Sequence, residues 1–463
     1  METIRRPDIK NYRIYLIIAG LLVSGIMYSC DRFNFFPKRT HIEGIVLDGI
    51  SFEKLSGATI TLKPSQGSPA TTTGQVTVDE NGRYKFEDVT IGNYNLSVKT
   101  EGYKEIIADD IALNDQYAFI ALLPVSDEIN MITGGITGRV TNNQGNPLSG
   151  VSVAVSSQDM ALTNGFFTAA VTDEKGHFFI GAIPLDKTNE FMIRFAADSY
   201  EIFIEENKVI PANGIIHLHA EMQNEATPDI IFYEGFENNH DNWDKTGFWE
   251  VHQNAAVYNK AFPKFVQVAP NDSSAGRIPD AIKGEYMAWF GQESRGNYMG
   301  QQSPYDTSLT GGTGTEANRG ELISPWINLG QVQKASVSFW SWFEIESATP
   351  HPYGFDLMKV YVIQDDTNPE IFLGSLNPDI TQLLNDRDAL PLTSGGFNQA
   401  PVWRFEEFDL GAFIGSRIKI KFVFDTRDHR HNGFRGWFID EIKVVEKDTQ
   451  ITFSADLPQG ITR

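Results

Sequence analysis

Apolar and polar residues alternate along most of this chain. The alternating segments are residues 60–62, 94–98, 151–155, 191–195, 337–343, 358–362 and 418–424. Because successive side chains of a strand point to opposite faces, a period of two predicts half-buried β-strands. The one helix that the sequence suggests, residues 380–385, is short. The pattern therefore predicts an all-β protein.

The first half of the chain contains an internal repeat. Gly138 follows Gly44 by 94 positions, and the segments 79–82 and 173–176 have the same spacing and the same Asp-Glu-x-Gly pattern. Asx side chains and a glycine between two strands are typical of a tight hairpin turn. A repeat of this length is a complete small domain used twice.

Four motifs recur in order in both copies: Gly-x-Val, Leu-Ser-Gly-Ala/Val, Asp-x-x-Gly-x-Tyr/Phe and a closing Gly-Tyr-like strand. Over residues 42–124 and 135–222 this order resembles the carboxypeptidase regulatory-like domain. The resemblance implies a prealbumin/Ig-like sandwich that serves as a spacer or interaction module and is not itself a peptidase. The second copy departs from the first by an insertion around residues 160–167.

The second half differs in character, since all eight tryptophans fall after the polar linker at residues 222–229. Four segments, residues 232–237, 320–329, 355–361 and 436–442, resemble the MAM-like or choice-of-anchor jelly roll of secreted bacterial proteases and surface adhesins. The predicted fold class is therefore all-β, with two prealbumin/Ig-like sandwiches followed by a larger jelly roll. The predicted domains are residues 40–126, 132–224 and 229–447, each an independent unit, with a tail at residues 448–463.

The N-terminal residues have the pattern of a targeting signal. Four basic residues precede an uncharged apolar run, Ile14 to Ile26, and Cys30, the one cysteine of the chain, follows it. This layout is typical of a secretory signal, and a cysteine without a partner builds no disulfide framework. Residues 1–30 are therefore predicted to be a lipoprotein signal peptide ending at a lipidated Cys30. An uncleaved membrane span is the alternative, because the run is close to spanning length.

Both interpretations place the body outside the cytoplasm, since the basic residues precede the apolar run. Resemblance to Bacteroidetes-type lipoproteins implies the outer membrane of the cell envelope, facing either the surface or the periplasm. The chain holds 60 acidic against 38 basic side chains, a net charge of −22. This charge argues against nucleic acid as a partner, so membrane contact is expected only through the lipid.

No catalytic residues are predicted. His-Glu-x-x-His and Gly-x-Ser-x-Gly do not occur in the sequence. Glu344 and Glu346 form a carboxylate pair, but they lie on one predicted strand, without a second strand to set the separation that glycosidases need. The chain is therefore predicted not to be an enzyme.

A structural calcium ion is predicted in the jelly roll. Related jelly rolls bind calcium where their first and last strands meet, and those strands carry Glu237 and Asp440, with Asp356 as a third candidate. The alternative is that these carboxylates bond to backbone amides or pair with Arg435. His217 and His219 also alternate on one strand, as a two-histidine chelate or as two solvated residues.

Two groups of side chains are candidate ligand-binding residues. Trp289, Trp340 and Trp342 are able to stack on sugar rings if they are exposed, whereas buried rings would be core. The loop of residues 425–431 adds Asp428, His429 and His431. The predicted function is a lipid-anchored surface binding or adhesion protein, whose jelly roll binds a glycan or a protein. The alternatives are a structural subunit of an envelope assembly and a hydrolase accessory protein.

Overall fold

The computed structural model describes residues 38–113, 118–127, 132–157, 168–185, 190–224, 229–238, 242–262, 268–305, 311–346, 355–364, 370–377, 391–446 and 452–453. These residues form β-strands and one short 3-10 turn, Gly411–Phe413, so the all-β prediction is confirmed. Three sequence predictions lie outside the described residues: the signal with Cys30, the insertion at residues 160–167 and the helix at residues 380–385. Within the described part of the chain, no helix is long and apolar enough to cross a membrane.

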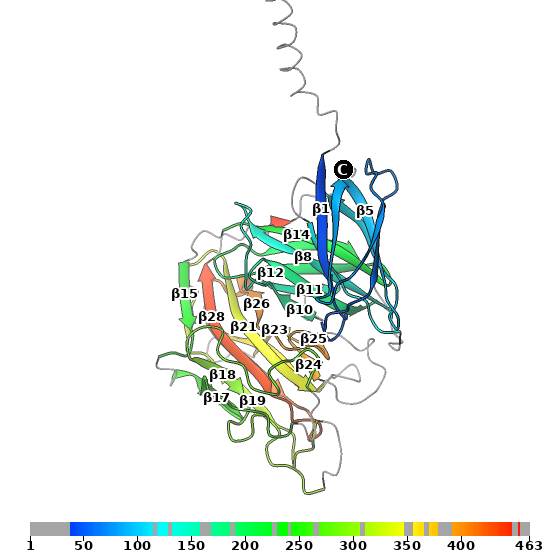
Figure 1. Ribbon diagram of the computed structural model, residues 1–463. Helices are drawn as coiled ribbons and strands as arrows, with labels where there is room; N and C mark the ends of the chain where they lie inside the picture. Colours follow the sequence, from blue (N-terminus) through cyan, green and yellow to red (C-terminus); the bar gives the residue numbers. More distant parts are fainter. Residues whose placement is uncertain are drawn as a thin grey trace, which may run out of the picture.

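Unit 1, the first copy of the repeat, is a two-layer sandwich (Figure 1). One layer has the strand order β4-β1-β7 and the other contains β6-β5-β2-β3. Its strands are β1 (Arg39–Val46), β2 (Thr59–Pro64), β3 (Gly74–Thr77), β4 (Arg83–Thr90), β5 (Gly92–Lys99), β6 (Ile106–Leu113) and β7 (Ala118–Leu122). Tyr94, Leu96 and Val98 of β5 point into the core between the layers and are fully buried, as the alternation predicts.

Unit 2, the second copy, has the same two-layer plan. Its layers have the orders β11-β8-β14 and β10-β9-β12-β13. The strands are β8 (Thr133–Asn142), β9 (Ser152–Ser157), β10 (Thr168–Val171), β11 (His177–Pro184), β12 (Glu190–Ala196), β13 (Phe203–Val209) and β14 (Gly214–Met222). Phe191, Ile193 and Phe195 of β12 fill the core in the manner of the β5 residues in unit 1.

The two copies of the repeat share one sheet. β14 pairs in parallel with β6 through Gly214 opposite Ile107 and Ile215 opposite Ala108, which makes a seven-stranded sheet from strands of both units. Ile215 belongs to the hydrophobic core of unit 1. The Phe119 ring also stacks on His177, with ring centroids 4.3 Å apart. Units 1 and 2 therefore form one body.

The C-terminal sandwich, residues 229–446, has an eight-stranded and a six-stranded sheet. The eight-stranded sheet is built on β17-β18-β28-β21-β24-β25 with β15 and β26 attached, and the six-stranded sheet on β16-β19-β27-β22-β23 with β20 attached. The strands are β15 (Asp229–Glu234), β16 (Asp244–Lys245), β17 (Trp249–Gln253), β18 (Tyr286–Phe290), β19 (Arg319–Ile323), β20 (Ile327–Asn328), β21 (Ala335–Glu346), β22 (Leu357–Gln364), β23 (Ile371–Ser375), β24 (Pro391–Thr393), β25 (Gly396–Phe397), β26 (Arg404–Asp409), β27 (Arg417–Asp425) and β28 (Gly436–Glu446). A further strand, β29 (Thr452–Phe453), pairs with β13 of unit 2.

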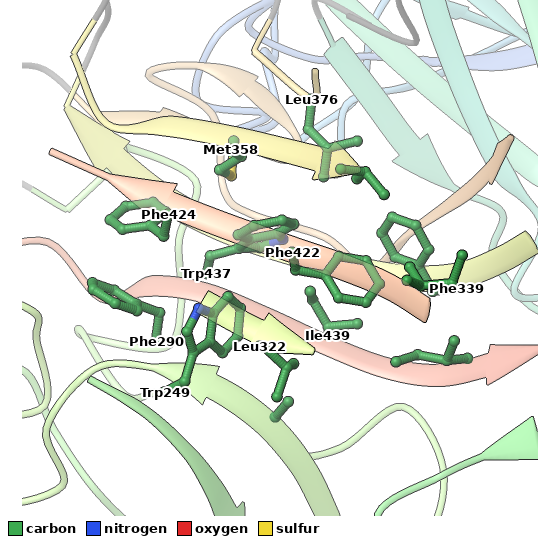
Figure 2. Close-up of a cluster of buried hydrophobic side chains, with 14 of the residues drawn as sticks. Trp249, Phe290, Leu322, Phe339, Met358, Leu376, Phe422, Phe424, Trp437 and Ile439 are labelled. Carbon is green, nitrogen blue, oxygen red and sulfur yellow. The ribbon is translucent and has the colours of Figure 1, made fainter. Parts of the chain in front are cut away.

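Aromatic side chains fill the space between these two sheets. Figure 2 shows Phe339 from β21, Trp437 from β28 and Phe422 from β27 meeting in the middle of this core. The Phe339 and Phe422 rings are 5.0 Å apart in a T-shaped arrangement, and the Phe422 and Trp437 rings are 5.9 Å apart. Such pairs add stabilisation to that of the buried area itself, so the core holds the ends of the strands in fixed places.

Unit 2 docks on the outer face of the eight-stranded sheet. The buried Arg194 of β12 donates to the carbonyl oxygen of Phe405 and lies 3.4 Å from a carboxylate oxygen of Glu406, which is fully buried. Thr168 Oγ1 donates to the Gly395 carbonyl oxygen at 2.6 Å. Buried apolar side chains of both parts surround these contacts. The three parts of the chain are thus joined by buried surfaces rather than strung on open linkers.

Candidate functional site

The three candidate stacking tryptophans are buried, and an exposed platform formed by them is ruled out. The exposed fractions of Trp289, Trp340 and Trp342 are 0%, 6% and 5%. Trp289 stacks on Phe438 with ring centroids 5.2 Å apart, and Trp342 meets the same ring edge-on. A sugar ring has no access to these faces, so the tryptophans take the core role that the sequence left open.

The cause is a second layer over the outer face of the eight-stranded sheet. Ile278, Val257 and Ala281 cover Trp289 and Trp342. Trp340 packs against Phe405 and against Ala196 of unit 2. Alternation along β21 predicts one buried face and one exposed face, but loops and unit 2 cover the second face.

Glu237 and Asp440 lie near the same backbone segment and accept its amide hydrogens. Glu237 Oε1 accepts from the N–H groups of Glu285 and Tyr286, both at 2.8 Å. Asp440 is fully buried, and its Oδ2 accepts from Ile282 N at 3.1 Å and from the neighbouring Lys283 N at 3.4 Å, while its Oδ1 accepts from Glu441 N. Burial, together with the smaller effect of the Glu441 charge, raises the pKa of Asp440 to about 8, although the backbone amides that donate to the carboxylate oppose this rise. Bonding to backbone amides was the alternative to calcium here, and this is the arrangement in the structure.

Asp356 does not join that pair. Asp356 accepts a hydrogen bond from the amide of Glu346 on β21. Asp440 pairs instead with Trp340, which lies six residues earlier on the same strand. At about 3.3 Å per residue this separates the two places by roughly 20 Å. Arg435 does not pair with Glu237 or Asp440 either, because it binds Glu344 and Asp272. The sequence placed the three carboxylates in one site, whereas the fold divides them between two.

The second place is the loop end of the C-terminal sandwich, where β21 ends, β22 begins and the loop of residues 425–435 leads into β28. Here Asp356 is fully buried, and its Oδ2 accepts from Tyr298 Oη at 2.5 Å and from Glu346 N at 2.7 Å. Asn377 Nδ2 donates to the Asp356 carbonyl oxygen at 3.0 Å. The backbone of Asp356 has a φ of 56°, an uncommon value for a residue with a side chain. Packing and hydrogen bonds therefore fix this carboxylate.

The three loop candidates lie at this same end. Asp428 Oδ1 accepts from Arg430 N at 2.7 Å, and the Asp428 carbonyl oxygen accepts from Thr426 Oγ1 and Asn432 Nδ2. The carbonyl oxygen of His429 and the amide of His431 bond to the loop of residues 311–314. The structure thus brings Asp428 and Asp356 into one region, beside His429 and His431.

Electrostatics connect these groups. Burial raises the pKa of Glu346, and the charges of Asp356 and Asp428 raise it further. Burial also raises the pKa of Asp356, where Tyr298 opposes the effect by its hydrogen bond and Asp428 adds to it. Like charges close together in a buried place disfavour the ionised form of both carboxyls. The loop end is therefore an electronegative, water-poor corner of the sandwich.

A buried ion pair network holds this end in shape. The guanidinium of Arg435 binds the carboxylates of Glu344 and Asp272, and its Nη1 donates to Ser274 Oγ at 2.7 Å. It also lies over the Trp342 ring, 4.9 Å from the centroid. Breaking such a network leaves an uncompensated buried charge, so it ties the covering loop firmly to the sheet. Glu344 is therefore bound by Arg435, whereas Glu346 lies outside this ion pair network.

The sequence did not mark Tyr298 as a member of a site, and it suggested Arg435 only as a partner of Glu237 and Asp440 and Glu346 only as a partner of Glu344. No local motif marks these residues, because their partners are about 10 to 160 positions away. Within the described residues, no group of three or more His, Cys, Asp or Glu side chains is arranged to hold a metal ion. His217 and His219 instead bond to Thr137 and Thr141 on the neighbouring strand.

Comparison with known proteins supports the first unit. A family profile described as the carboxypeptidase regulatory-like domain matches residues 41–118. No curated protein matches the sequence.

Solved structures give only weak similarity. The K2 cleaved adhesin domain of Lys-gingipain is 13% identical, with a TM-score of 0.25, over 47% of this chain and 98% of that one. The shaft pilin SpaA from Lactobacillus rhamnosus GG is 10% identical, with a TM-score of 0.17, over 41% of this chain and 99% of the pilin. The Bacillus anthracis TIE protein is 17% identical, with a TM-score of 0.15, over 40% of this chain and 34% of the TIE chain. The chain thus spans about a third of the TIE protein, and similarity at this level carries no functional argument. What the comparisons identify is a carboxypeptidase regulatory-like domain at residues 41–118 of an all-β chain.

Proposed function

We propose that this chain is a non-catalytic, lipid-anchored surface protein, in which units 1 and 2 and the C-terminal sandwich act as one rigid scaffold for adhesion. The observation that carries the proposal is the continuity of the three parts. The shared sheet joins units 1 and 2, and the buried contact of Arg194 with Glu406 joins unit 2 to the C-terminal sandwich. Parts that are joined by buried contacts transmit force and hold a distant surface at a fixed position.

The arrangement in space supports a scaffold. Figure 1 shows the beginning of β1 at one end of the molecule, and the loop end of the C-terminal sandwich toward the opposite end. An anchor at Cys30 would then leave the loop end facing away from the membrane. Binding residues concentrate on loops that a rigid framework holds, and this end collects several of them.

The partner that we propose is a protein rather than a glycan. Glycan binding was predicted from exposed tryptophan rings, and Trp289, Trp340 and Trp342 are buried. The calcium ion predicted at Glu237 and Asp440 stays a prediction. Backbone amides donate hydrogen bonds to the Asp440 carboxylate, so the proposal does not depend on calcium there. The same rigid body is also compatible with a structural subunit of an envelope assembly. That role differs from adhesion only in that the protein partner is on the same cell.

Two experiments test the proposal. Replacing Cys30 by Ser should move the full chain from the membrane fraction to the soluble fraction and abolish incorporation of labelled palmitate. Continued labelling of the variant would contradict the lipid anchor.

The second experiment measures binding of fluorescent residues 31–463 to intact cells that lack the protein, by flow cytometry. Saturable binding that is lost after protease treatment of the cells, and that survives periodate oxidation of their glycans, supports adhesion through protein. Binding that periodate abolishes would contradict a protein partner, and no saturable binding would contradict adhesion altogether.

A further inference from the structure

The outer face of the six-stranded sheet has aromatic and aliphatic side chains in its middle. Along β22 the side chains of Val360 and Val362 point into the core and are fully buried. Tyr361 and Ile363 alternate with them, so they point outward, where they are half-buried. Phe372 of β23 lies opposite Tyr361, and its side chain is 53% exposed. The two rings meet edge to face with centroids 5.5 Å apart, so aromatic rings form the surface here.

The other sheet of the same sandwich carries aromatic residues on its outer face too, but there they are covered. Unit 2 packs on Trp340, and a loop packs on Trp342. In the described part of the chain, the buried clusters that join unit 2 to the C-terminal sandwich include no residue of β22 or β23. The outer face of the six-stranded sheet is therefore available to a partner.

The edge of this sheet also lacks the usual protection against pairing. β23 ends the strand order of its sheet, and its sequence, Ile-Phe-Leu-Gly-Ser, has no charged residue and no proline. Proteins usually place such residues on an exposed edge, because its N–H and C=O groups pair readily with another chain. Ile371 is exposed beside Phe372 on this strand. The edge strand thus points to a protein partner independently of the outer face.

Two cations stand at the ends of the aromatic stretch. Lys359 pairs with Val423 of β27, and Arg417 lies six residues before Val423 on the same strand. At about 3.3 Å per residue, roughly 20 Å separate the two positions. Arg417 lies over the ring of the half-buried Trp326, 5.1 Å from its centroid. The aromatic stretch therefore lies between two positive charges.

These two cations are left without a carboxylate, unlike the lysine in the middle of the face. Lys421 is buried and binds Glu321 and Glu370. Among the described residues, Lys359 and Arg417 form no ion pair. The face therefore offers unpaired positive charge in a chain whose net charge is −22. Carboxylates of a partner would complement it, whereas a basic partner would be repelled.

We propose that an acidic protein partner binds this β22–β23 face, with Tyr361 and Phe372 at the centre of the contact and Lys359 and Arg417 at its ends. Protein interfaces have an apolar centre and a polar rim, and aromatic residues and arginine contribute most to their affinity. The inference rests on the adhesion proposed above and adds the surface and the charge of its partner. The face adjoins the loop end, since Lys359 is two residues from the start of β22.

The test measures the Kd of fluorescent residues 31–463 for the same intact cells in two variants. Phe372→Ala removes the central ring, and Arg417→Glu places a carboxylate where the partner's carboxylates would lie. Each should raise the Kd about tenfold or more. Tyr258→Ala, which removes a ring of similar exposure from another loop, and Lys63→Glu, which reverses an exposed lysine of unit 1, are the matched controls. Both controls should keep the wild-type Kd.

The acidic character of the partner is tested on the cells themselves. Amidation of their surface carboxylates with carbodiimide and glycinamide should weaken wild-type binding as strongly as Arg417→Glu does. Higher salt should also weaken it, because it screens the attraction between the two surfaces. Phe372 and Arg417 are exposed, so both variants should melt at the wild-type temperature. Lys359→Glu, at the other end of the face, gives the charge test again if Arg417→Glu unfolds.

The possible failures are distinct. Saturable wild-type binding that neither Phe372→Ala nor Arg417→Glu weakens would assign the partner to another surface and leave adhesion intact. Unchanged binding to amidated cells would overturn the acidic partner. Wild-type dimers in analytical ultracentrifugation that Phe372→Ala dissociates would give the face to a second copy of this chain instead. No saturable binding of the wild-type protein would contradict adhesion itself and, with it, this inference.

Discussion

β5 in unit 1 and β12 in unit 2 are equivalent strands of the two repeats. Their inner faces are alike, but their outer faces differ in burial. Toward the core, Leu96 and Ile193 are both fully buried. Toward the outside, β5 presents half-buried polar residues such as Asn95, whereas β12 presents the buried Met192 and Arg194. The outer face of β5 remains accessible to solvent, and the outer face of β12 lies against the C-terminal sandwich.

This difference shows that one motif carries two kinds of information. The inner positions determine the sandwich and are similar in both copies. The outer positions determine what the sandwich packs against, and they have diverged. In unit 2 even β9 is buried on both faces, because Ala154 and Met192 pack together beneath Val402. A repeat unit with strands that are buried on both faces packs against another part of the chain and does not stand apart as a separate spacer.

The largest effect is expected from the buried ion pair of unit 2. Arg194→Ala removes the guanidinium beside the fully buried Glu406 and the Phe405 carbonyl oxygen, so the free energy of unfolding should fall by about 3–5 kcal/mol. Ser97→Ala, at the equivalent position of unit 1, should change it by less than about 0.5 kcal/mol. Urea unfolding of residues 31–463 followed by tryptophan fluorescence measures both. Equal effects of the two substitutions would show that the outer faces do not differ in energy.

A smaller effect is expected when a residue of one repeat replaces its counterpart in the other. Met192→Asn puts the residue type of Asn95 into the apolar interface around Ala154 and Ala169, and should destabilise the protein by roughly 2–3 kcal/mol. The reverse change, Asn95→Met, loses the hydrogen bonds that Ser65 and the Asp110 amide donate to Asn95 Oδ1, which costs about 1 kcal/mol each at most. Thermal unfolding compares the pair, and a greater loss in Asn95→Met would reverse the proposed roles of the two faces.

The contact between the repeats should respond to pH. Burial, with smaller contributions from the charges of His219 and His177, lowers the pKa of His217 to about 4. Because an unfolded histidine has a pKa near 6.5, the unfolded chain binds more protons between pH 6.5 and 4. The stability contributed by neutral His217 is therefore fully present above pH 6.5 and is lost as the pH falls toward 4, by roughly 1–2 kcal/mol after allowance for its partial exposure.

Denaturant unfolding at pH 7 and at pH 5 checks this dependence. His177→Phe keeps a ring to stack on Phe119 and removes one of the buried imidazoles, so the loss of stability at pH 5 should shrink in this variant. His429→Gln, in the exposed part of the 425–431 loop, is the control and should keep the wild-type pH dependence. An unaltered pH dependence in His177→Phe would remove the role assigned to that imidazole.

The smallest effect is expected from exposed ion pairs at the edge of the same interface. Lys443 lies 3.0 Å from Asp198 of unit 2, whose side chain is 44% exposed. Since exposed pairs are screened by solvent, Asp198→Ala should cost at most about 0.5 kcal/mol. Glu87→Ala, which removes the exposed pair with Lys85 in unit 1, is the control and should leave the stability essentially unchanged. Calorimetry that finds a loss above about 1 kcal/mol for Asp198→Ala alone would extend the buried interface to its edge.

Strands and turns could be predicted because they depend on neighbouring residues. Alternation located β5, β12 and β21, and the Asp79 and Asp173 turns lie between strands as expected. The candidate site was predicted only in pieces. Asp356 was linked with Glu237 and Asp440 from the order of motifs, but Tyr298 and Glu346 hold it elsewhere, and nothing in the local sequence states which distant residues meet.

The sequence by itself determined the all-β class, the repeat and the inner faces of its strands, because these follow from a period of two and from turn residues a few positions apart. Only the tertiary structure decided that Trp289, Trp340 and Trp342 are buried, that β14 joins β6 in one sheet, and that Glu346 and Asp356 share a corner. The physical reason is that local periodicity divides the residues of a strand between two faces but does not determine what covers each face. Whether an outer face contacts water or another domain depends on contacts between residues far apart in the chain, such as Arg194 and Glu406.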